Sequence, residues 1–428
     1  MYINSFFQFL KLNKHQWLRK EKLEKLQWKK LKFVLNYAHN NVPFYREKFK
    51  KANLKPSDIK KSHDMLNIPV TTKEELRLHF PAIAQKFSVD DLYYSKTSGS
   101  TGEPIKTFYN KSAWIHSKYL IKIRARLACG LKIGDRIAVL DALNREEIAK
   151  QEKKGFSIFN LFIKKKTFSV FEDVEEQISL FESFKPNAFD GYPSYLKLLA
   201  EFVKENNLMD IKPRIVFTTA EMLDRKTRRI IETGFNASVF DIYGCTEFKE
   251  ISWECKNHEG YHTNIDSLFV EFTKNQQHVD NGEKGEIVCT SLYNEAMPLI
   301  RYTIGNVGKK LEYNCSCGRG LPLMDVLMGR TVDCFSLPQG KIVSPYSLTT
   351  AIETINGLLQ YQIIQEKIDS IKVKARVSEG FSEKEDAQLK ANLLKIVGKG
   401  VNIELKIVEK IEREKNGKYR VVLSKVKK

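Results

Sequence analysis

Apolar runs alternate with helical patterns between residues 90 and 300. Short strand-like runs are expected at 137–140, 188–189, 214–218, 238–242 and 285–290. Helical spacing of apolar residues is expected at 112–129, 174–184, 193–206 and 223–234. This alternation predicts an α/β domain with a largely parallel sheet. Residues 268–302 are more purely β in pattern, and the Asp-Asn-Gly-Glu stretch at 280–283 predicts a hairpin turn.

The two ends of the chain differ from this middle part. Residues 15–50 predict a helix that ends near Pro43, and residues 72–80 a short helix. After Asp333 the pattern predicts helices at 346–356 and 382–397 and strands at 361–366, 370–377 and 402–408. We therefore expect a large N-terminal domain over 1–332, with a helical segment over 1–60, and a small α+β domain over 333–428.

Composition narrows the class of protein. The chain has 428 residues, of which 42% are apolar, which is ample for more than one core. No window approaches about 18 uninterrupted apolar residues, so no transmembrane helix is expected. Lys11 interrupts the apolar start and no small-residue cleavage site follows, so no signal peptide is expected. Seven unevenly spread cysteines favour a reducing, cytoplasmic setting over a disulfide framework.

The net charge of +19 is concentrated at the start of the chain. The first 60 residues hold fifteen Lys or Arg against four Asp or Glu, which gives +11 of the total. A solvated helical face is the simplest interpretation. A second is weak contact with an anionic membrane surface, with Phe6, Phe7, Leu10 and Trp17 at the lipid boundary. Nucleic-acid binding is a third, but no recognition motif accompanies the charge.

A Gly- and hydroxyl-rich turn, Thr-Ser-Gly-Ser-Thr-Gly-Glu-Pro at 97–104, is the first candidate for chemistry. Glycine allows close backbone approach to an anion, and hydroxyls add short donors. No Gly-Lys-Ser/Thr follows, so the turn is not a Walker loop. It predicts a phosphate cradle.

Several other segments join this turn in a recognisable order. They are Tyr-Gly-Cys-Thr-Glu at 243–247, Arg-Tyr-Thr-Ile-Gly-Asn at 301–306, Gly-Arg-Thr-Val-Asp at 329–333 and Asn-Gly-Lys-Tyr-Arg at 416–420. Together they resemble the adenylate-forming enzymes, and most of all the phenylacetate–CoA ligase branch with its homologues from polysaccharide gene clusters. The resemblance covers about residues 30–425.

The resemblance implies ATP and magnesium as cofactors, with CoA as the acyl acceptor. It implies that Lys418 is the catalytic cation, because an ammonium near the attacking carboxylate stabilises charge that grows in the transition state. The residues that it implies around the nucleotide are Ser98, Gly99, Ser100, Thr101, Gly102, Ala220, Glu221, Tyr243, Gly244, Arg301, Asn306 and Arg330.

Two positions at the implied nucleotide site need comment. Glu247, beside Thr246 and just past a predicted strand, is the expected magnesium ligand, since a carboxylate oxygen suits a hard cation. A loop carboxylate in a salt bridge is the alternative. Asn306 departs from the family, which usually has aspartate there to hold both ribose hydroxyls. Asparagine keeps one acceptor oxygen and loses the charge, so either ATP binds more weakly or the site is compensated.

A second metal site is predicted from three cysteines and a histidine. Cys255, His262, Cys315 and Cys317 form a Cys₃His set that suits tetrahedral, structural zinc. His258 is the alternative imidazole. The simpler alternative to a metal site is that the cysteines are reduced and unrelated to one another.

These features predict a cytoplasmic, ATP-dependent ligase that activates a small carboxylic acid as an acyl-adenylate and passes the acyl group to CoA. One alternative is transfer to a sugar or amine acceptor in surface polysaccharide biosynthesis. Another, motivated by Asn306, is a non-catalytic binding protein with a ligase fold. If the basic N-terminus contacts lipid, the enzyme is peripheral to the inner membrane face.

Overall fold

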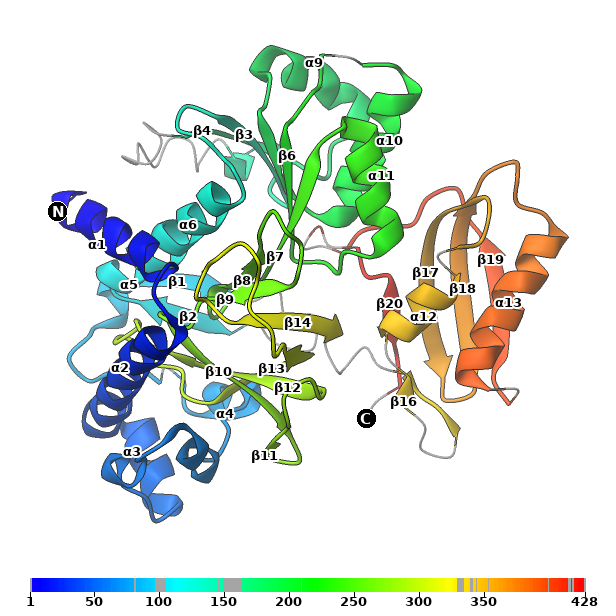
Figure 1. Ribbon diagram of the computed structural model, residues 1–428. Coiled ribbons are helices and arrows are strands. Elements are labelled where there is room, and N and C mark those ends of the chain that lie inside the picture. The colour runs from blue at the N-terminus through cyan, green and yellow to red at the C-terminus, as the bar shows by residue number, and fades with distance from the viewer. Residues whose placement is uncertain are drawn as a thin grey trace. The chain divides into compact units, whose positions relative to one another are not determined.

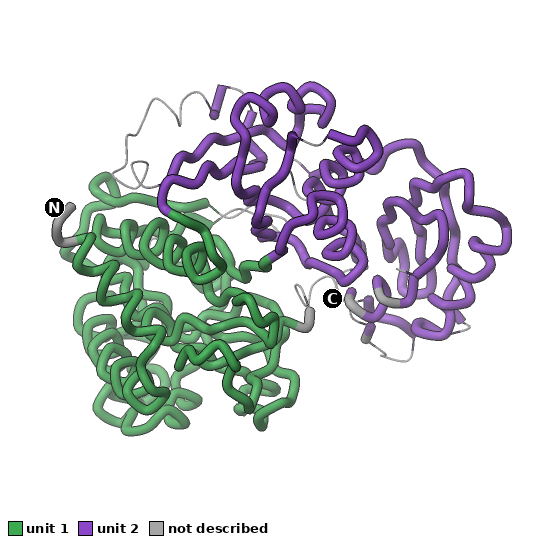
Figure 2. The backbone as a smooth tube through the Cα atoms, turned by 45° about the horizontal axis from the view of Figure 1, so that its top comes forward, with its two compact units in different colours: residues 1–132, 240–326 green, residues 133–239, 327–428 purple. Residues whose placement is uncertain are grey.

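The computed structural model describes residues 2–80, 82–96, 105–144, 146–148, 163–208, 210–328, 335–338, 342–343, 345–352, 354–398, 400–414, 417 and 419–426. These form two compact units, coloured separately in Figure 2: residues 1–132 with 240–326, and residues 133–239 with 327–428. We call them unit 1 and unit 2. Within the described residues, no helix combines the length and apolar character needed to cross a membrane.

Unit 1 begins with three helices where the sequence pattern predicted one. They are α1 (Tyr2–His15), α2 (Lys20–Asn41) and α3 (Pro43–Lys51). The break before α3 has a local cause: Val42 is extended at φ −117°, as the following proline requires, and Pro43 starts the next helix. The apolar face of α2 packs inward at Leu23, Leu31, Val34 and Ala38, which are buried.

The rest of unit 1 is a hairpin, a helix and a mostly antiparallel sheet. The hairpin is β1 (Tyr93–Lys96) with β2 (Lys106–Tyr109), and α4 (Lys73–Leu78) precedes it. α5 (Lys111–Ile115) continues through a π-helical turn into α6 (Ile121–Ala128). The sheet strands are β7 (Ser238–Cys245), β8 (Lys249–Glu254), β9 (Tyr261–Thr263), β10 (Leu268–Lys274), β11 (Gln277–His278), β12 (Gly285–Ser291), β13 (Tyr302–Lys310) and β14 (Leu323–Met328). Their spatial order is β11-β10-β12-β13-β14-β9-β8-β7.

The hairpin predicted at 280–283 is displaced. β10 turns back into β11 at Asn275 and Gln276, which both have positive φ and so form the tight turn. Residues 280–283 instead lead from β11 into β12, which pairs with the other side of β10.

Unit 2 contains the parallel part of the fold. Strands β3 (Arg136–Asp141), β4 (Lys164–Ser169), β5 (Ala188–Gly191) and β6 (Ile215–Thr219) pair in parallel in the order β6-β5-β3-β4. Helices α9 (Val174–Phe184), α10 (Pro193–Glu205) and α11 (Arg225–Phe235) alternate with them, and α10 and α11 lie side by side (Figure 1). The pattern missed β4, because this edge strand begins with three lysines, a common protection of sheet edges.

Unit 2 also contains a small α+β sheet near the C-terminus. Strands β17 (Leu358–Lys367), β18 (Ser370–Val377), β19 (Asn402–Ile407) and β20 (Val422–Ser424) form it, in the order β19-β18-β17-β20. Helices α12 (Pro345–Ile352) and α13 (Glu383–Val397) pack on it around a separate hydrophobic core (Figure 1). The short pair β15 (Phe335–Ser336) and β16 (Ile342–Val343) precedes them. The predicted fold class, a large α/β part with mixed sheet and a small α+β part, is confirmed.

Candidate active site

The loop after β7 holds Thr246 and Glu247 in a fixed position in unit 1. The Tyr109 hydroxyl donates to the Glu247 carbonyl oxygen at 2.8 Å and lies 3.2 Å from that of Thr246. The Tyr302 hydroxyl donates to Glu247 Oε1 at 3.0 Å. The Tyr302 phenol therefore orients this carboxylate, while Tyr109 holds the backbone of the loop. Among the ion pairs of the described residues, none includes Glu247, so the salt bridge that was the alternative to a metal site is not found there. An anchored carboxylate at a strand end is suited to hold magnesium.

Tyr243 and Asn306 lie together beside this loop. Burial raises the pKa of Tyr243 well above its usual value, and the Asn306 side chain lowers it to a lesser extent. Gly244 is required for a reason that the sequence did not indicate. A Cβ there would lie 2.0 Å from the carbonyl oxygen of Lys249, across a bulge between β7 and β8.

Lys249 was not predicted from the sequence. It has φ +61° and its ammonium donates to the Ser95 hydroxyl, next to the rings of Tyr109 and Trp114. Burial lowers its pKa to about 8. The sequence could have indicated Lys249 only through its position two residues after Glu247. Its partner Ser95 lies in β1, the strand that precedes the Gly-rich turn.

Arg301, which the resemblance placed around the nucleotide, is held in unit 1 by contacts within the protein. Its side chain is 1% exposed; Nε donates to Glu271 Oε2 at 3.1 Å, and Nη1 donates to the backbone carbonyls of Leu66 and Ile68. These contacts favour a structural role, in which the guanidinium ties the segment before α4 to β10. They give no support to the predicted phosphate contact.

Several predicted site residues lie outside the described residues: Ser98, Gly99, Ser100, Thr101, Gly102, Arg330 and Lys418. The strands that flank the predicted cradle are described. β1 and β2 pair with Lys96 opposite Lys106, so the two ends of the Gly-rich turn are brought together.

Ala220 and Glu221 lie in unit 2, after β6. Ala220 has φ +68°, and Glu221 turns inward, where burial raises the pKa of its carboxyl. Its Oε2 accepts the Ser194 backbone N–H at 3.0 Å, and its Oε1 accepts that of Tyr419 at 2.6 Å. The structure thus brings Glu221 to a chain neighbour of Lys418.

The four predicted zinc ligands converge in unit 1. The ligand atoms of Cys255, His262, Cys315 and Cys317 all lie within 4.8 Å of one another. Cys255 Sγ is 3.5 Å from Cys315 Sγ, and Cys317 Sγ is 3.3 Å from His262 Nε2. His262 Nδ1 lies 3.2 Å from the Leu321 carbonyl oxygen, which leaves Nε2 directed at the thiols. The alternative imidazole, His258, stacks instead on Phe240.

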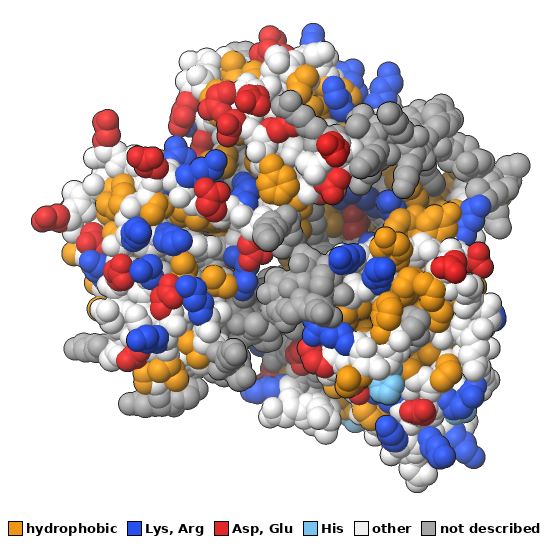
Figure 3. All heavy atoms as spheres, turned by 180° about the vertical axis from the view of Figure 1, so that it is seen from behind, with side chains coloured by type: hydrophobic (Ala, Val, Ile, Leu, Met, Phe, Trp, Pro, Cys, Tyr) orange, Lys and Arg blue, Asp and Glu red, His pale blue; other side chains and the backbone are white. Residues whose placement is uncertain are grey.

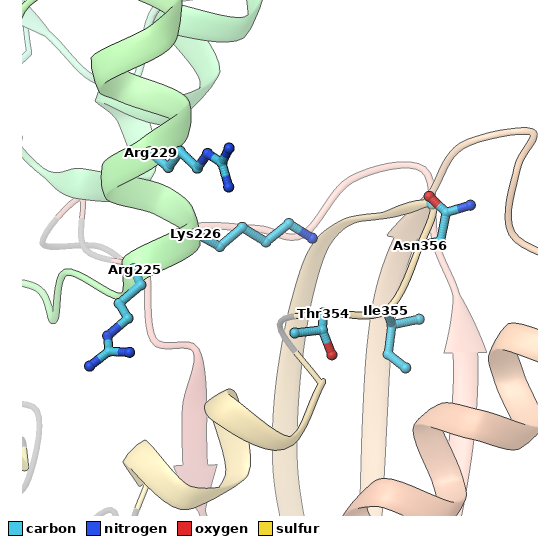
Figure 4. Close-up of a pocket in the computed structure, with 7 residues that line it drawn as sticks. Arg225, Lys226, Arg229, Thr354, Ile355 and Asn356 are labelled. Atoms are coloured by element: carbon cyan, nitrogen blue, oxygen red, sulfur yellow. The ribbon is translucent and has the colours of Figure 1, made fainter.

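A separate pocket of about 430 Å³ opens in unit 2, between the start of α11 and the segment before β17 (Figure 4). Arg225, Lys226 and Arg229 line one side, and residues 354–357 line the other. The Lys226 ammonium donates to the Leu358 carbonyl oxygen at 3.1 Å. None of the predicted site residues lines this pocket, so its cations are additional to the predicted site.

Comparison with known proteins identifies relatives of this chain. The family described as CapK C-terminal domain matches residues 335–425. The phenylacetate–coenzyme A ligase of Thermus thermophilus is 27% identical over 381 residues, covering 85% of this chain and 83% of that protein. Protein CapK of Staphylococcus aureus is 27% identical over 422 residues, covering 95% and 90%.

Solved structures show the same fold. The crystal structure of 2-hydroxyisobutyryl-CoA ligase in the postadenylation state matches with a TM-score of 0.80 at 21% identity, covering 96% of this chain and 90% of that one. The same ligase in the thioesterification state matches with a TM-score of 0.64. The chain is therefore a relative of the phenylacetate–CoA ligases and of CapK, and its fold is that of the adenylate-forming ligases.

Proposed function

We propose that this protein is an ATP-dependent acid–CoA ligase that works through an acyl-adenylate. In the first step, a carboxylate oxygen of the acid bonds to the α-phosphorus of ATP. The bond from that phosphorus to the β-phosphate oxygen breaks, and pyrophosphate leaves with the electron pair. In the second step, the CoA sulfur bonds to the acyl carbon, AMP leaves, and the thiol proton is lost.

The observation that carries this proposal is the extent of the likeness, which covers 85% of the chain in a phenylacetate–coenzyme A ligase. The hydrogen bond from the Tyr302 hydroxyl to the Glu247 carboxylate supports the choice of Glu247 as metal ligand. In this proposal Glu247 holds magnesium, Tyr243 and Asn306 contact the nucleoside, and the Gly-rich turn holds the phosphates. Lys418 supplies the positive charge at the attacking carboxylate.

A second candidate acceptor is a sugar or amine in surface polysaccharide assembly. It is favoured by the match to CapK over 95% of the chain and by the CapK-type C-terminal domain. Adding CoA or an amino sugar to enzyme, ATP and acid, and following AMP and product, separates the two. CoA-dependent thioester formation supports the first acceptor, and amide formation without CoA supports the second.

We also propose that zinc occupies the Cys255–His262–Cys315–Cys317 cluster as a structural ion. Three thiols and one imidazole fill a tetrahedral shell and leave no position for a reactive water. Burial lowers the pKa of His262 to about 4, so the imidazole is neutral, the form that binds metals. The cluster joins β9 to the loop between β13 and β14.

Weak contact of α1 with an anionic membrane surface completes the proposal. One face of α1 is fixed in unit 1: the Leu12 carbonyl accepts from buried Arg124 at 3.1 Å, and His15 Nδ1 lies 3.1 Å from Asp266. Phe6 and Phe7 point away from that face and are 52% and 62% exposed. By contrast, Lys and Arg are mixed with Asp and Glu on the face of the molecule in Figure 3. The exposed Phe6 and Phe7 in the basic N-terminal segment favour contact with a lipid surface. The mixed charges on the face in Figure 3 do not form the basic patch that is typical of nucleic-acid binding.

A further inference from the structure

Both chain neighbours of Lys418 are held in unit 2 by hydrogen bonds from or to side chains. Tyr419 is buried; its N–H donates to Glu221 Oε1 at 2.6 Å, and its hydroxyl donates to the Tyr361 carbonyl oxygen. Gly417 is buried as well, with φ +71°, and its carbonyl oxygen accepts from Arg413 Nη1 at 3.1 Å. The chain around position 418 is therefore fixed on both sides.

Glu221 connects this segment to helix α10. One carboxylate oxygen accepts the Tyr419 N–H, and the other accepts the N–H of Ser194 in the first turn of α10. The Glu221 side chain is 7% exposed. Both of its oxygens are thus engaged by backbone donors, an arrangement that fixes a carboxylate in one orientation.

Arg413 makes a second connection between the same two elements. Its Nη1 donates to the Ser194 hydroxyl at 2.8 Å as well as to the Gly417 carbonyl oxygen, and it lies 4.0 Å from Glu221 Oε1. The guanidinium stacks over the Tyr195 ring at 5.5 Å. The two opposite charges therefore compensate each other in a site that excludes most water.

We propose that Glu221 and Arg413 are positioning residues, which hold Gly417 and Tyr419 near α10 and so place Lys418 for the first half-reaction. This inference rests on the proposed function for the role of Lys418. The contacts explain Glu221 differently from the motif, which implied a part in adenine binding, because both carboxylate oxygens already have protein donors.

The Glu221–Arg413 pair can fix the geometry of this contact without making the contact strongly stable. Burying two charges costs nearly as much as their attraction returns, so the pair fixes geometry without adding much stability. Removing one partner leaves the other buried and uncompensated. The single variants should then be as impaired as the double variant, which is how coupled residues behave.

The test compares Glu221→Gln, Arg413→Met and the double variant in three measurements. Glu232→Gln is the matched control, because Glu232 lies 4.0 Å from Arg228 on α11 and touches none of these contacts. We expect the pyrophosphate-exchange rate to fall by about 10- to 100-fold in all three variants, the scale for a misplaced reacting group. The KM for ATP, and thioester formation from synthetic adenylate, should change by less than about 2-fold.

The third measurement does not depend on activity. Hydrogen exchange of the Tyr419 amide should be slow in the wild type and in Glu232→Gln, and faster in Glu221→Gln. Unchanged exchange of that amide would overturn the contact itself. A faster amide with wild-type adenylation would overturn the positioning role, and a raised KM for ATP with an unchanged turnover would assign Glu221 to the adenine instead. A wild type that shows no pyrophosphate exchange, but a Glu221-dependent Tyr419 amide, would refute the proposed function and leave the contact established.

Discussion

Gly417→Ala should impair adenylation strongly, because the added Cβ is disfavoured by the backbone conformation and also collides with neighbouring side chains. Gly417 has φ +71°, and a non-glycine residue in this region loses about 1–2 kcal/mol. The added Cβ would also lie 2.2 Å from the Ala142 Cβ and 3.0 Å from Val170 Cγ2. Carbon atoms rest at about 3.5–4.0 Å, so the turn has to move by more than about 1 Å. A displacement of that size near the reacting groups costs about 100-fold in rate.

The assay is ATP–pyrophosphate exchange, with thioester formation from synthetic adenylate measured in parallel. Gly134→Ala is the control, since Gly134 has φ +90° but nothing lies within 4 Å of the added Cβ. The control shares the backbone cost without the collision and should exchange at the wild-type rate. If folded Gly417→Ala exchanges as fast as the control, the turn does not need its position in unit 2 and the reasoning fails.

Four further predictions concern Lys418, the zinc cluster, Asn306 and the start of α1. Lys418→Ala should slow adenylate formation by about two to three orders of magnitude and affect the second half-reaction less, measured with synthetic adenylate; a wild-type exchange rate would exclude it as the catalytic cation. Elemental analysis should find about one zinc per chain, and Cys317→Ser should lower both zinc content and Tm, whereas a metal-free protein of full stability would remove the zinc proposal. Asn306→Asp should lower the KM for ATP and leave that for the acid unchanged, because a charged acceptor binds ribose hydroxyls more strongly; a raised KM would mean that the site is adapted to asparagine. Replacing Phe6 and Phe7 by Ala should reduce co-sedimentation with anionic liposomes at low salt, and equal recovery with neutral liposomes would leave only the solvated-helix interpretation.

The sequence predicted those parts of the fold that local patterns determine. Strand β18 was predicted at 370–377 and helix α9 at 174–184, with the bounds that the structure has. The bounds of such elements can be predicted because the period of the apolar residues lies within one segment of the sequence. The edge strand β4 was missed because its lysines hide the pattern.

The candidate site divides in the same way. Cys255, His262, Cys315 and Cys317 were all predicted as metal ligands, with Cys315 and Cys317 only two residues apart, and the structure brings the four ligand atoms together. The sequence could not predict that Tyr109 holds Glu247, because Tyr109 lies 138 residues away along the chain and only the fold brings the two together. Arg301 is a further case: the resemblance placed it around the nucleotide, which stays a prediction, and nothing in the sequence indicated its positive φ or its ion pair with buried Glu271.

The same limit applies to Glu221, which the resemblance placed around the nucleotide. Its bond to the Tyr419 amide joins positions 198 residues apart, so no local pattern contains it. A motif specifies which residue types meet at a site. Which side chain ends up holding which backbone group depends on long-range packing.

The central claim is that the chain activates a carboxylic acid with ATP, and ATP–pyrophosphate exchange tests it most directly. The enzyme would be assayed with magnesium over a panel of aryl, fatty and amino acids, with and without each acid. We predict exchange that depends on one class of acid and on magnesium, and that is reduced in Glu247→Gln. Folded, zinc-replete protein that shows no acid-dependent exchange with any member of the panel would contradict the account.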